Sequence, residues 1–369
     1  MLQNKIYYNY FFEILRTFFT IVFGLSLIAL TVRAVNFLEL IVDNGYSLIT
    51  YFSYSILNIF GLAPKFFPLA FLVSIVIFIV KHNNNNEFVI LWTAGVKKIK
   101  ITNLLLFSSL VVMVFYLIFS VYLTPLALNK SRKLLSQSQF NSFLPTIRSQ
   151  QFSDSFKGLT FLVEKKIDNE IENIFLHDTS DNLRKFTSSS SNIQDTTIIA
   201  KKGIVEDKAL FLLNGQILSQ KKSNDENEII KFEELNIDLS RLKTTIITDF
   251  KLQETSTLKL LRCFINQNIN LKICNNETKQ EIVPVMIRRL VLPMYIPIIS
   301  LICSFLLFKK NNFFSNRLLI FLYSFILLIF LELIIKYTGM NNILKSLYII
   351  LPIILLVTIY PILNYKSSR

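Results

Sequence analysis

The sequence predicts an α-helical membrane protein with six transmembrane helices, arranged three plus three, around an inserted antiparallel β domain of the jelly-roll-like type. Two observations lead to this fold class. Apolar residues make up 52% of the 369 residues and charged residues only 17%, and the apolar residues are concentrated near the two ends of the chain. The polar segment between them contains short strand-like runs separated by turn residues.

Six stretches are apolar over nearly the length of about 20 residues that a spanning helix requires. They are Thr17–Val42, Tyr54–Val80, Ile101–Leu123, Leu290–Phe308, Leu318–Ile335 and Ser346–Leu363. Buried helices of a large soluble protein are the alternative, but these runs are rich in Phe, Leu and Ile on every face, which favours membrane helices. The first span lacks a small-residue cleavage site, so we expect it to remain as an uncleaved first helix.

Basic residues in the short loops predict the orientation, because cytoplasmic loops carry the excess of Lys and Arg. One set of loops holds Lys5, Arg16, Lys81, Lys97, Lys98, Lys100, Lys309, Lys310, Arg317, Lys366 and Arg369. The opposite short loops, 43–53 and 336–345, hold only Lys336 and Lys345. Both termini are therefore expected in the cytoplasm and the central domain outside. Much of the net charge of +14 follows from this asymmetry and does not indicate a nucleic-acid partner.

The outside segment is predicted to be β because short apolar runs alternate with turn residues. The strand candidates are Leu159–Glu164, Ile171–His177, Thr197–Val205, Ala209–Leu213, Gln216–Ser219 and Ile229–Ile237. Asn214-Gly215 lies between two of them and is a strong hairpin signal. The expected domains are transmembrane helices 1–3 in residues 1–125, the β domain in 126–255, a partly helical connector in 256–284 and transmembrane helices 4–6 in 285–369.

The three cysteines do not indicate a disulfide-rich scaffold. Cys263 and Cys274 lie in the connector, where the outside compartment would permit a bridge, and both a bridge and two free thiols remain open. Cys303 lies inside the fourth span, where we expect it to serve packing.

Catalytic motifs are absent from the sequence. There is no Walker A pattern, no Gly-rich dinucleotide motif and no Cys/His metal spacing. His82 and His177 are the only histidines, expected in a cytoplasmic loop and in the outside domain, so they cannot share a site. The sequence therefore predicts no enzyme, no cofactor and no metal centre.

A short cytoplasmic helix is expected at about 84–95, between the second and third spans. Asn84 followed three residues later by Glu87 resembles a capping box, and Gly95 suits a helix C-terminus. Spacing of i, i+3 and i+4 places three apolar side chains on one face: Phe88, Leu91 and Trp92. Two interpretations remain open, namely docking of this face in a groove of a soluble partner and simple attachment to the membrane surface.

Four basic residues lie at one depth, on the side where the positive-inside bias would not place them. Counted at ~1.5 Å per helical residue, Arg33, Lys65, Arg288 and Arg289 rise roughly 25–30 Å above the cytoplasmic edge. Snorkelling is one explanation. The other is a ring of cations facing an anionic headgroup in the outer leaflet, with Asn36 adding a polar contact. We expect Glu332 to form a local ion pair with Lys336, four residues later, rather than a proton relay.

Several stretches together resemble the LptF/LptG family of lipopolysaccharide-export ABC permeases. They are Phe67-Pro68-Leu69-Ala70, the segment from Glu87 to Gly95, Phe175-Leu176-His177-Asp178, the run from Phe232 to Leu239, and the segment from Arg288 to Pro293. The third and fourth look more like LptF than LptG. The order of three helices, a β domain and three more helices is also similar to that of the family.

The resemblance implies a permease subunit that extracts lipopolysaccharide from the outer leaflet of the bacterial inner membrane. It implies an LptG-like permease as partner, an LptB-like ATPase dimer that grips Glu87, an LptC-like single-span protein and an LptA-like periplasmic bridge. Lipopolysaccharide would enter between the first and fifth helices, and Arg33 would contact its lipid A phosphates. The sequence departs from the family pattern at Asn36 and at Val285, where the family often has a basic residue and a Glu.

Two other functions remain as alternatives. One is a permease of another lipid or lipoprotein ABC exporter, although such chains resemble four-helix proteins with the outside domain after the first helix. The other is a non-transporting membrane scaffold or sensor, which would need neither outer-leaflet cations nor a cytoplasmic docking helix.

Overall fold

The computed structural model describes residues 2–42, 46–146, 149–156, 158–167, 169–179, 183, 193–206, 209–221, 227–238, 251–265, 276–308 and 313–368. The chain divides into two compact units, which we describe separately. The membrane unit comprises Met1–Thr31, Asn58–Asn129 and Lys251–Arg369, and the sheet unit comprises Val32–Leu57 and Lys130–Phe250.

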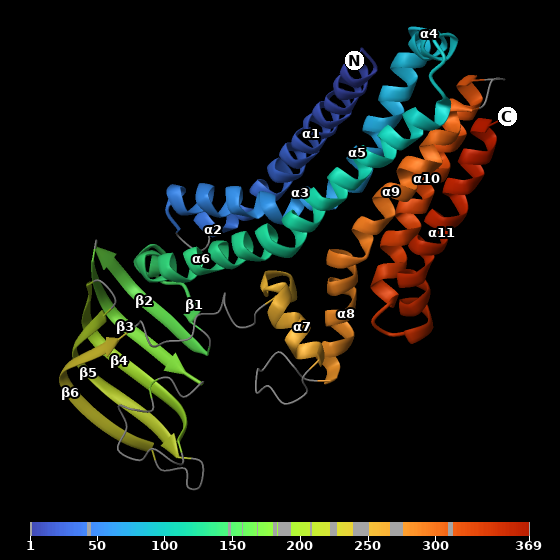
Figure 1. The fold of residues 1–369 in the computed structure, drawn as a ribbon. Helices are drawn as coiled ribbons and strands as arrows, with labels where there is room; N and C mark the ends of the chain where they lie inside the picture. The colour runs from blue at the N-terminus through green and yellow to red at the C-terminus, as the bar shows by residue number, and fades with distance from the viewer. Residues whose placement is uncertain are drawn as a thin grey trace. The chain divides into compact units, whose positions relative to one another are not determined.

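Six helices among the described residues are long and apolar enough to span a membrane, which confirms the prediction. They are α1 (Leu2–Phe37), α3 (Leu48–Asn84), α5 (Lys98–Ile118) with η1 (Phe119–Leu123) and α6 (Thr124–Thr146), α8 (Asn276–Leu290) with η5 (Leu292–Met294), α9 (Tyr295–Ser304) and η6 (Phe305–Leu307), α10 (Phe313–Tyr337), and α11 (Asn342–Ser368). Figure 1 shows α9, α10 and α11 side by side. Most of these helices extend beyond the predicted apolar stretches, because a helix needs no apolar residues outside the hydrocarbon layer.

Prolines interrupt the backbone hydrogen bonds of several spans, because proline has no N–H to donate to the carbonyl four residues earlier. In a membrane such a carbonyl needs another donor. Three such carbonyls accept a hydrogen bond from a hydroxyl group of another element. The carbonyl of Phe60, four residues before Pro64, accepts from Thr124 at 2.7 Å. The carbonyl of Val121, four residues before Pro125, accepts from Thr257 at 3.0 Å, and that of Tyr348, four residues before Pro352, accepts from Tyr295 at 2.8 Å. These hydroxyls thus supply a hydrogen bond to each of the three carbonyls and also connect separate helical elements.

The core of the membrane unit is built from large side chains that are almost completely buried. They include Ile14, Phe18, Phe67, Phe71, Tyr116 and Tyr295. The ring of Phe18 on α1 meets the rings of Phe67 and Phe71 on α3 edge to face. Cys303 is buried and free, as the packing interpretation predicted.

The described strands form one antiparallel sheet in the order β1-β2-β3-β4-β5-β6. Their bounds are β1 (Ser153–Phe156), β2 (Leu159–Ile167), β3 (Glu170–Asp178), β4 (Ile193–Glu206), β5 (Ala209–Lys221) and β6 (Asn227–Asp238). Every strand therefore pairs with its neighbour in sequence, as Figure 1 shows. Alternate side chains such as Phe161, Val163, Leu176 and Ile198 form a buried apolar face, which confirms the predicted antiparallel β architecture.

The predicted hairpin at Asn214-Gly215 is wrong, because β5 continues through both residues. Asn214 has a positive φ of 53°, which is the conformation that a hairpin turn at Asn-Gly requires. The pairs Leu213↔Glu234 and Gly215↔Phe232 nevertheless keep one register across this point. A Cβ on Gly215 would collide with the ring of Phe232. The glycine is therefore required by the close approach of an aromatic ring across the strands, a tertiary contact without a local sequence signal.

The segment between the sheet and the fourth span contains η4 (Leu252–Glu254) and α7 (Thr257–Ile265). Cys263 is disulfide-bonded and lies with Leu260 against Ile282 of α8. Cys274 lies outside the described residues. The short helices α2 (Glu39–Val42) and α4 (Glu87–Thr93) complete the fold.

Candidate functional site

A cavity of about 490 Å³ lies within the membrane unit, where α3, α5, α8 and α10 come together. Its charged lining residues are Lys65, Glu281, Arg288, Arg289, Glu332 and Lys336. Three of the four cations predicted at one depth therefore meet here. Lys336 joins them, although the sequence had suggested it only as a loop residue and as a partner of Glu332.

The walls of this cavity coincide with irregular backbone. Pro64 of α3, Pro284 of α8 and Ser120 of the π-helical turn η1 all line it. Helices that bend at such points cannot pack along their whole length. Gly61 of α3, which has no side chain, also lines the cavity.

Arg288 forms an ion pair across helices with Glu332, with its Nη2 2.6 Å from Oε2. The expected pair between Glu332 and Lys336 is therefore wrong, because a guanidinium of the adjacent helix reaches this carboxylate at the distance of a charge-assisted hydrogen bond. Nε of Arg288 is buried and has no partner in the described structure. The hydroxyl of Tyr116 donates to the carbonyl of Arg288 at 3.2 Å and holds this end of α8.

Arg289 is buried, with 4% of its surface exposed, and its guanidinium is enclosed by the chain itself. It donates to the carbonyls of Gln253 at 2.9 Å and Thr255 at 3.0 Å, and to the hydroxyl of Thr257 at 2.8 Å. A longer contact of 3.5 Å reaches the carbonyl of Leu252. This side chain thus fastens the segment that enters from the sheet to α8.

Arg33 and Asn36 lie in the sheet unit, on the part of α1 that follows Val32, and both are exposed. The same unit holds the beginning of α3. Tyr51 donates to the carbonyl of Ala34 at 3.0 Å, and the rings of Phe37 and Tyr54 lie 4.8 Å apart. These contacts fix the end of α1 while leaving the two polar side chains accessible.

The predicted cytoplasmic helix exists as α4, but it begins differently. α3 continues to Asn84, so the proposed capping box is absent. Asn86 occupies the cap position in the left-handed conformation without a side-chain cap, and the amide of Asn85 donates to Glu87 at 3.2 Å. Gly95, with φ of 86°, ends the helix as predicted, with two backbone hydrogen bonds of the Schellman type, Gly95 to Trp92 and Val96 to Leu91.

The apolar face of α4, for which docking in a partner's groove was one of two open interpretations, points inward in this structure. Phe88 is 1% exposed and belongs to the core of the membrane unit, and Leu91 and Trp92 pack against that core. A helix of seven residues is too short to be stable alone, and these side chains anchor it. The exposed apolar residues are instead Val89 and Ile90.

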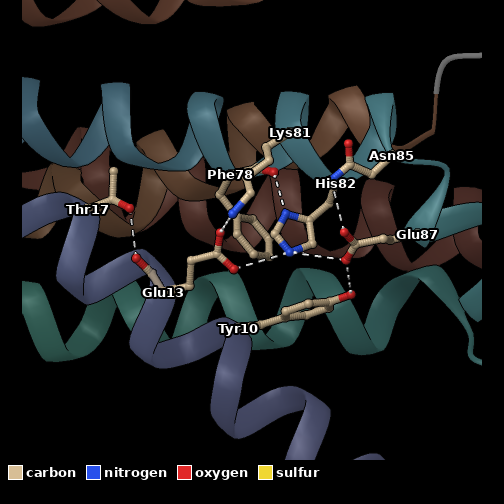
Figure 2. A network of polar contacts seen from close by, with 8 residues as sticks. All are labelled: Tyr10, Glu13, Thr17, Phe78, Lys81, His82, Asn85 and Glu87. Atoms are coloured by element: carbon tan, nitrogen blue, oxygen red, sulfur yellow. Dashed lines mark hydrogen bonds and ion pairs between the residues drawn. The ribbon is translucent and has the colours of Figure 1, made fainter.

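Glu87 belongs to a cluster of polar side chains at the ends of α1 and α3 (Figure 2). Its Oε2 lies 3.5 Å from Nε2 of His82 and accepts from the hydroxyl of Tyr10 at 3.3 Å. Nε2 of His82 also lies 3.3 Å from Glu13, which pairs with Lys81 at 2.6 Å. His82 was expected in a loop, but it is a buried residue of α3. Sequence reasoning missed Tyr10 and Glu13, for which the only signal is an acidic residue at the start of an apolar span.

One comparison bears on this chain. A family model described as "Lipopolysaccharide export system permease LptF/LptG" matches residues 10–365, which include the cavity, α4 and the sheet. A search of curated proteins found no match. Among the described residues, no group of three His, Cys, Asp or Glu side chains is placed to hold a metal ion.

Proposed function

Because the chain belongs to the LptF/LptG family and is therefore a lipopolysaccharide export permease, we propose that it is the LptF-type subunit. It would pair with an LptG-like permease in the bacterial inner membrane. As a permease of this family it is a transport subunit without catalytic activity, and it belongs to an Lpt transporter complex. The LptF-like motifs at Phe175–Asp178 and at Phe232–Leu239 support the finer assignment.

The proposed orientation places both termini and α4 in the cytoplasm and the sheet in the periplasm. The distribution of Lys and Arg in the loops supports it. In this orientation the cavity of the membrane unit opens near the outer leaflet, where the lipid A headgroup lies.

The cavity is the observation that carries the proposal of headgroup contact. Lys65, Arg288 and Lys336 supply positive charge to its lining, and the unpartnered Nε of Arg288 is a donor that a phosphate oxygen would satisfy. Arg289 would shape the wall through its carbonyl contacts rather than grip the lipid. Arg33 and Asn36, both exposed on α1, would also contact a lipid A headgroup.

The cytoplasmic side would receive the energy input. An LptB-like ATPase dimer would bind the exposed side of α4, contacting Glu87, Val89 and Ile90, while Phe88, Leu91, Trp92 and Gly95 hold the helix in place. ATP binding would then squeeze the lipid cavity. An LptC-like single-span protein and an LptA-like periplasmic bridge would take the lipid onward from the sheet domain.

Photo-crosslinking in cells tests the substrate contact. A photoreactive amino acid at Arg33, Asn36 or Lys65 should form adducts with lipopolysaccharide. The matched control is the exposed Ile77, within α3 but far along the helix from Lys65, where no adduct is expected. Equal labelling at the control position, or labelling by phospholipid alone, would contradict headgroup binding and favour snorkelling.

A further inference from the structure

We propose that His82 is a positioning residue that ties the coupling carboxylate of Glu87 to the first membrane helix. The inference rests on the proposed function, in which α4 receives the motion of the ATPase. It adds the path by which that motion reaches α1. The link runs from Glu87 through the ring of His82 to Glu13.

The geometry makes His82 the only side chain of the described cluster that contacts both carboxylates. Nε2 lies 3.5 Å from Oε2 of Glu87 and 3.3 Å from Oε2 of Glu13 (Figure 2). Tyr10 supplies a second connection, because its hydroxyl donates to Glu87 from α1. Three elements therefore converge on one buried ring, namely the start of α1, the end of α3 and the start of α4.

The ring is fixed in orientation and cannot simply rotate away. Its Nδ1 lies 3.0 Å from the carbonyl of Phe78, and since a carbonyl oxygen only accepts, Nδ1 is the donor of that bond. Nε2 is thereby turned toward the carboxylates, and it donates to them in the doubly protonated form of the ring, in which both nitrogens carry a proton. The rings of Phe78, Tyr10 and Phe88 surround the imidazole at centroid distances of 4.3, 4.6 and 5.8 Å.

Burial distinguishes His82 from Lys81, the other basic residue of the cluster. The side chain of His82 is 3% exposed, whereas that of Lys81 is 57% exposed. An exposed ion pair contributes little because solvent screens it, and the buried contact is the more effective connection. Glu87 keeps 38% of its side chain exposed, so its remaining acceptor positions stay open to a partner.

The first helix, α1, is less buried by its own chain than the second span, so a contact at its end matters more for its position. In its most apolar stretch 17% of the residues are buried, compared with 61% in the second span. Apart from buried side chains such as Ile14 and Phe18, most of this stretch is not buried by its own chain. A contact at its cytoplasmic end would pass a displacement of α4 to this helix.

The test uses the complete transporter, reconstituted with lipopolysaccharide in lipid vesicles together with its ATPase and periplasmic bridge. His82→Phe keeps a ring among the aromatic neighbours and removes both nitrogens. We expect the ATPase to co-purify within about twofold and lipopolysaccharide transferred per ATP to fall about tenfold, within the roughly 5–150-fold range of allosteric coupling. The matched control is Asn83→Ala on the next residue of α3, which should leave both quantities unchanged.

Two further variants test the path. His82→Gln retains an N–H donor on the side of the carboxylates and should recover part of the transfer. Glu13→Gln combined with His82→Phe should be no worse than His82→Phe alone, because one connection cannot be broken twice. Unchanged transfer in His82→Phe, joint loss of ATPase binding and transfer, or additive losses in the double variant would each overturn the proposal.

Failure of the positioning role is distinguishable from failure of the coupling role. Glu87→Lys should release the ATPase from the complex. If the ATPase stays bound in that variant, the coupling role of α4 is refuted whatever His82→Phe does. If Glu87→Lys releases it while His82→Phe transfers lipid normally, only the positioning proposal is refuted.

Discussion

Arg289 lies among the cations predicted to face the lipid, yet its contacts predict a role in stability. Its guanidinium donates to two backbone carbonyls and to one hydroxyl at 2.8–3.0 Å. Hydrogen bonds from a charged group contribute about 1.5–3 kcal/mol each, and an acceptor left buried without a donor costs about 1–3 kcal/mol. Arg289→Met would leave these three acceptors without their donor.

The expected loss is about 3 kcal/mol or more, because each of the three acceptors left without a donor costs about 1–3 kcal/mol. Arg289→Lys should also destabilise the protein, because one ammonium group cannot reproduce a planar fork that reaches three separate acceptors. Thr257 extends the network, since its hydroxyl accepts from Arg289 and donates to the carbonyl of Val121.

Thermal unfolding of the purified complex in detergent measures the effect, with apparent midpoints compared at one protein concentration. Arg288→Met is the control, because the half-exposed ion pair with Glu332 should contribute only about 0–1 kcal/mol. Equal, small shifts for Met at 288 and at 289 would refute the reasoning. It would also be refuted if the Arg289 variant unfolded normally and failed only in lipopolysaccharide crosslinking.

Two further predictions concern local structure. Gly95→Ala should destabilise the end of α4 by about 1 kcal/mol, because φ of 86° is unfavourable for a residue with a Cβ even though no atom lies within 4 Å of it. Limited proteolysis of the connection after α4 should become faster, and Gly95→Asn should show a smaller effect because Asn tolerates this conformation. Thr124→Val should lower the thermal midpoint by an amount that corresponds to about 1 kcal/mol, because the carbonyl of Phe60 loses its donor; an unchanged midpoint would argue against this account of the kink.

The sequence predicted the membrane helices and the β domain well, because both follow from patterns that neighbouring residues impose. A run of apolar residues has to be buried in lipid or in protein wherever it is placed. The alternation in β3 and β4 is likewise a local property. The hairpin at Asn214-Gly215 failed because the same two residues also suit a strand when a ring on the adjacent strand requires a glycine.

The candidate site was predicted in part, and the gaps have a common physical origin. Helical rise gave the depth of Lys65, Arg288 and Arg289, and the structure brings these three residues to one cavity. Helical rise could not show that Arg289 donates to carbonyls of residues more than 30 positions away in the sequence. Likewise, periodicity identified the apolar face of α4 but not the surface on which that face packs, since spacing alone does not distinguish a partner from the chain's own core.

Two prolines within the spans, Pro64 and Pro284, line the cavity. Irregular backbone within a membrane is tolerated where neighbouring groups satisfy it or where it lines a polar space. Pro64 meets both conditions. Thr124 donates to the carbonyl of Phe60, which has no N–H partner at Pro64, and both Pro64 and Thr124 line the cavity. Pro284 also lines the cavity. Pro352 is not among the lining residues, and the carbonyl of Tyr348, four residues before it, accepts from the hydroxyl of Tyr295. At Pro64, therefore, a missing backbone hydrogen bond, a hydroxyl from another helix and the adjacent basic residue Lys65 meet at the wall of the polar cavity.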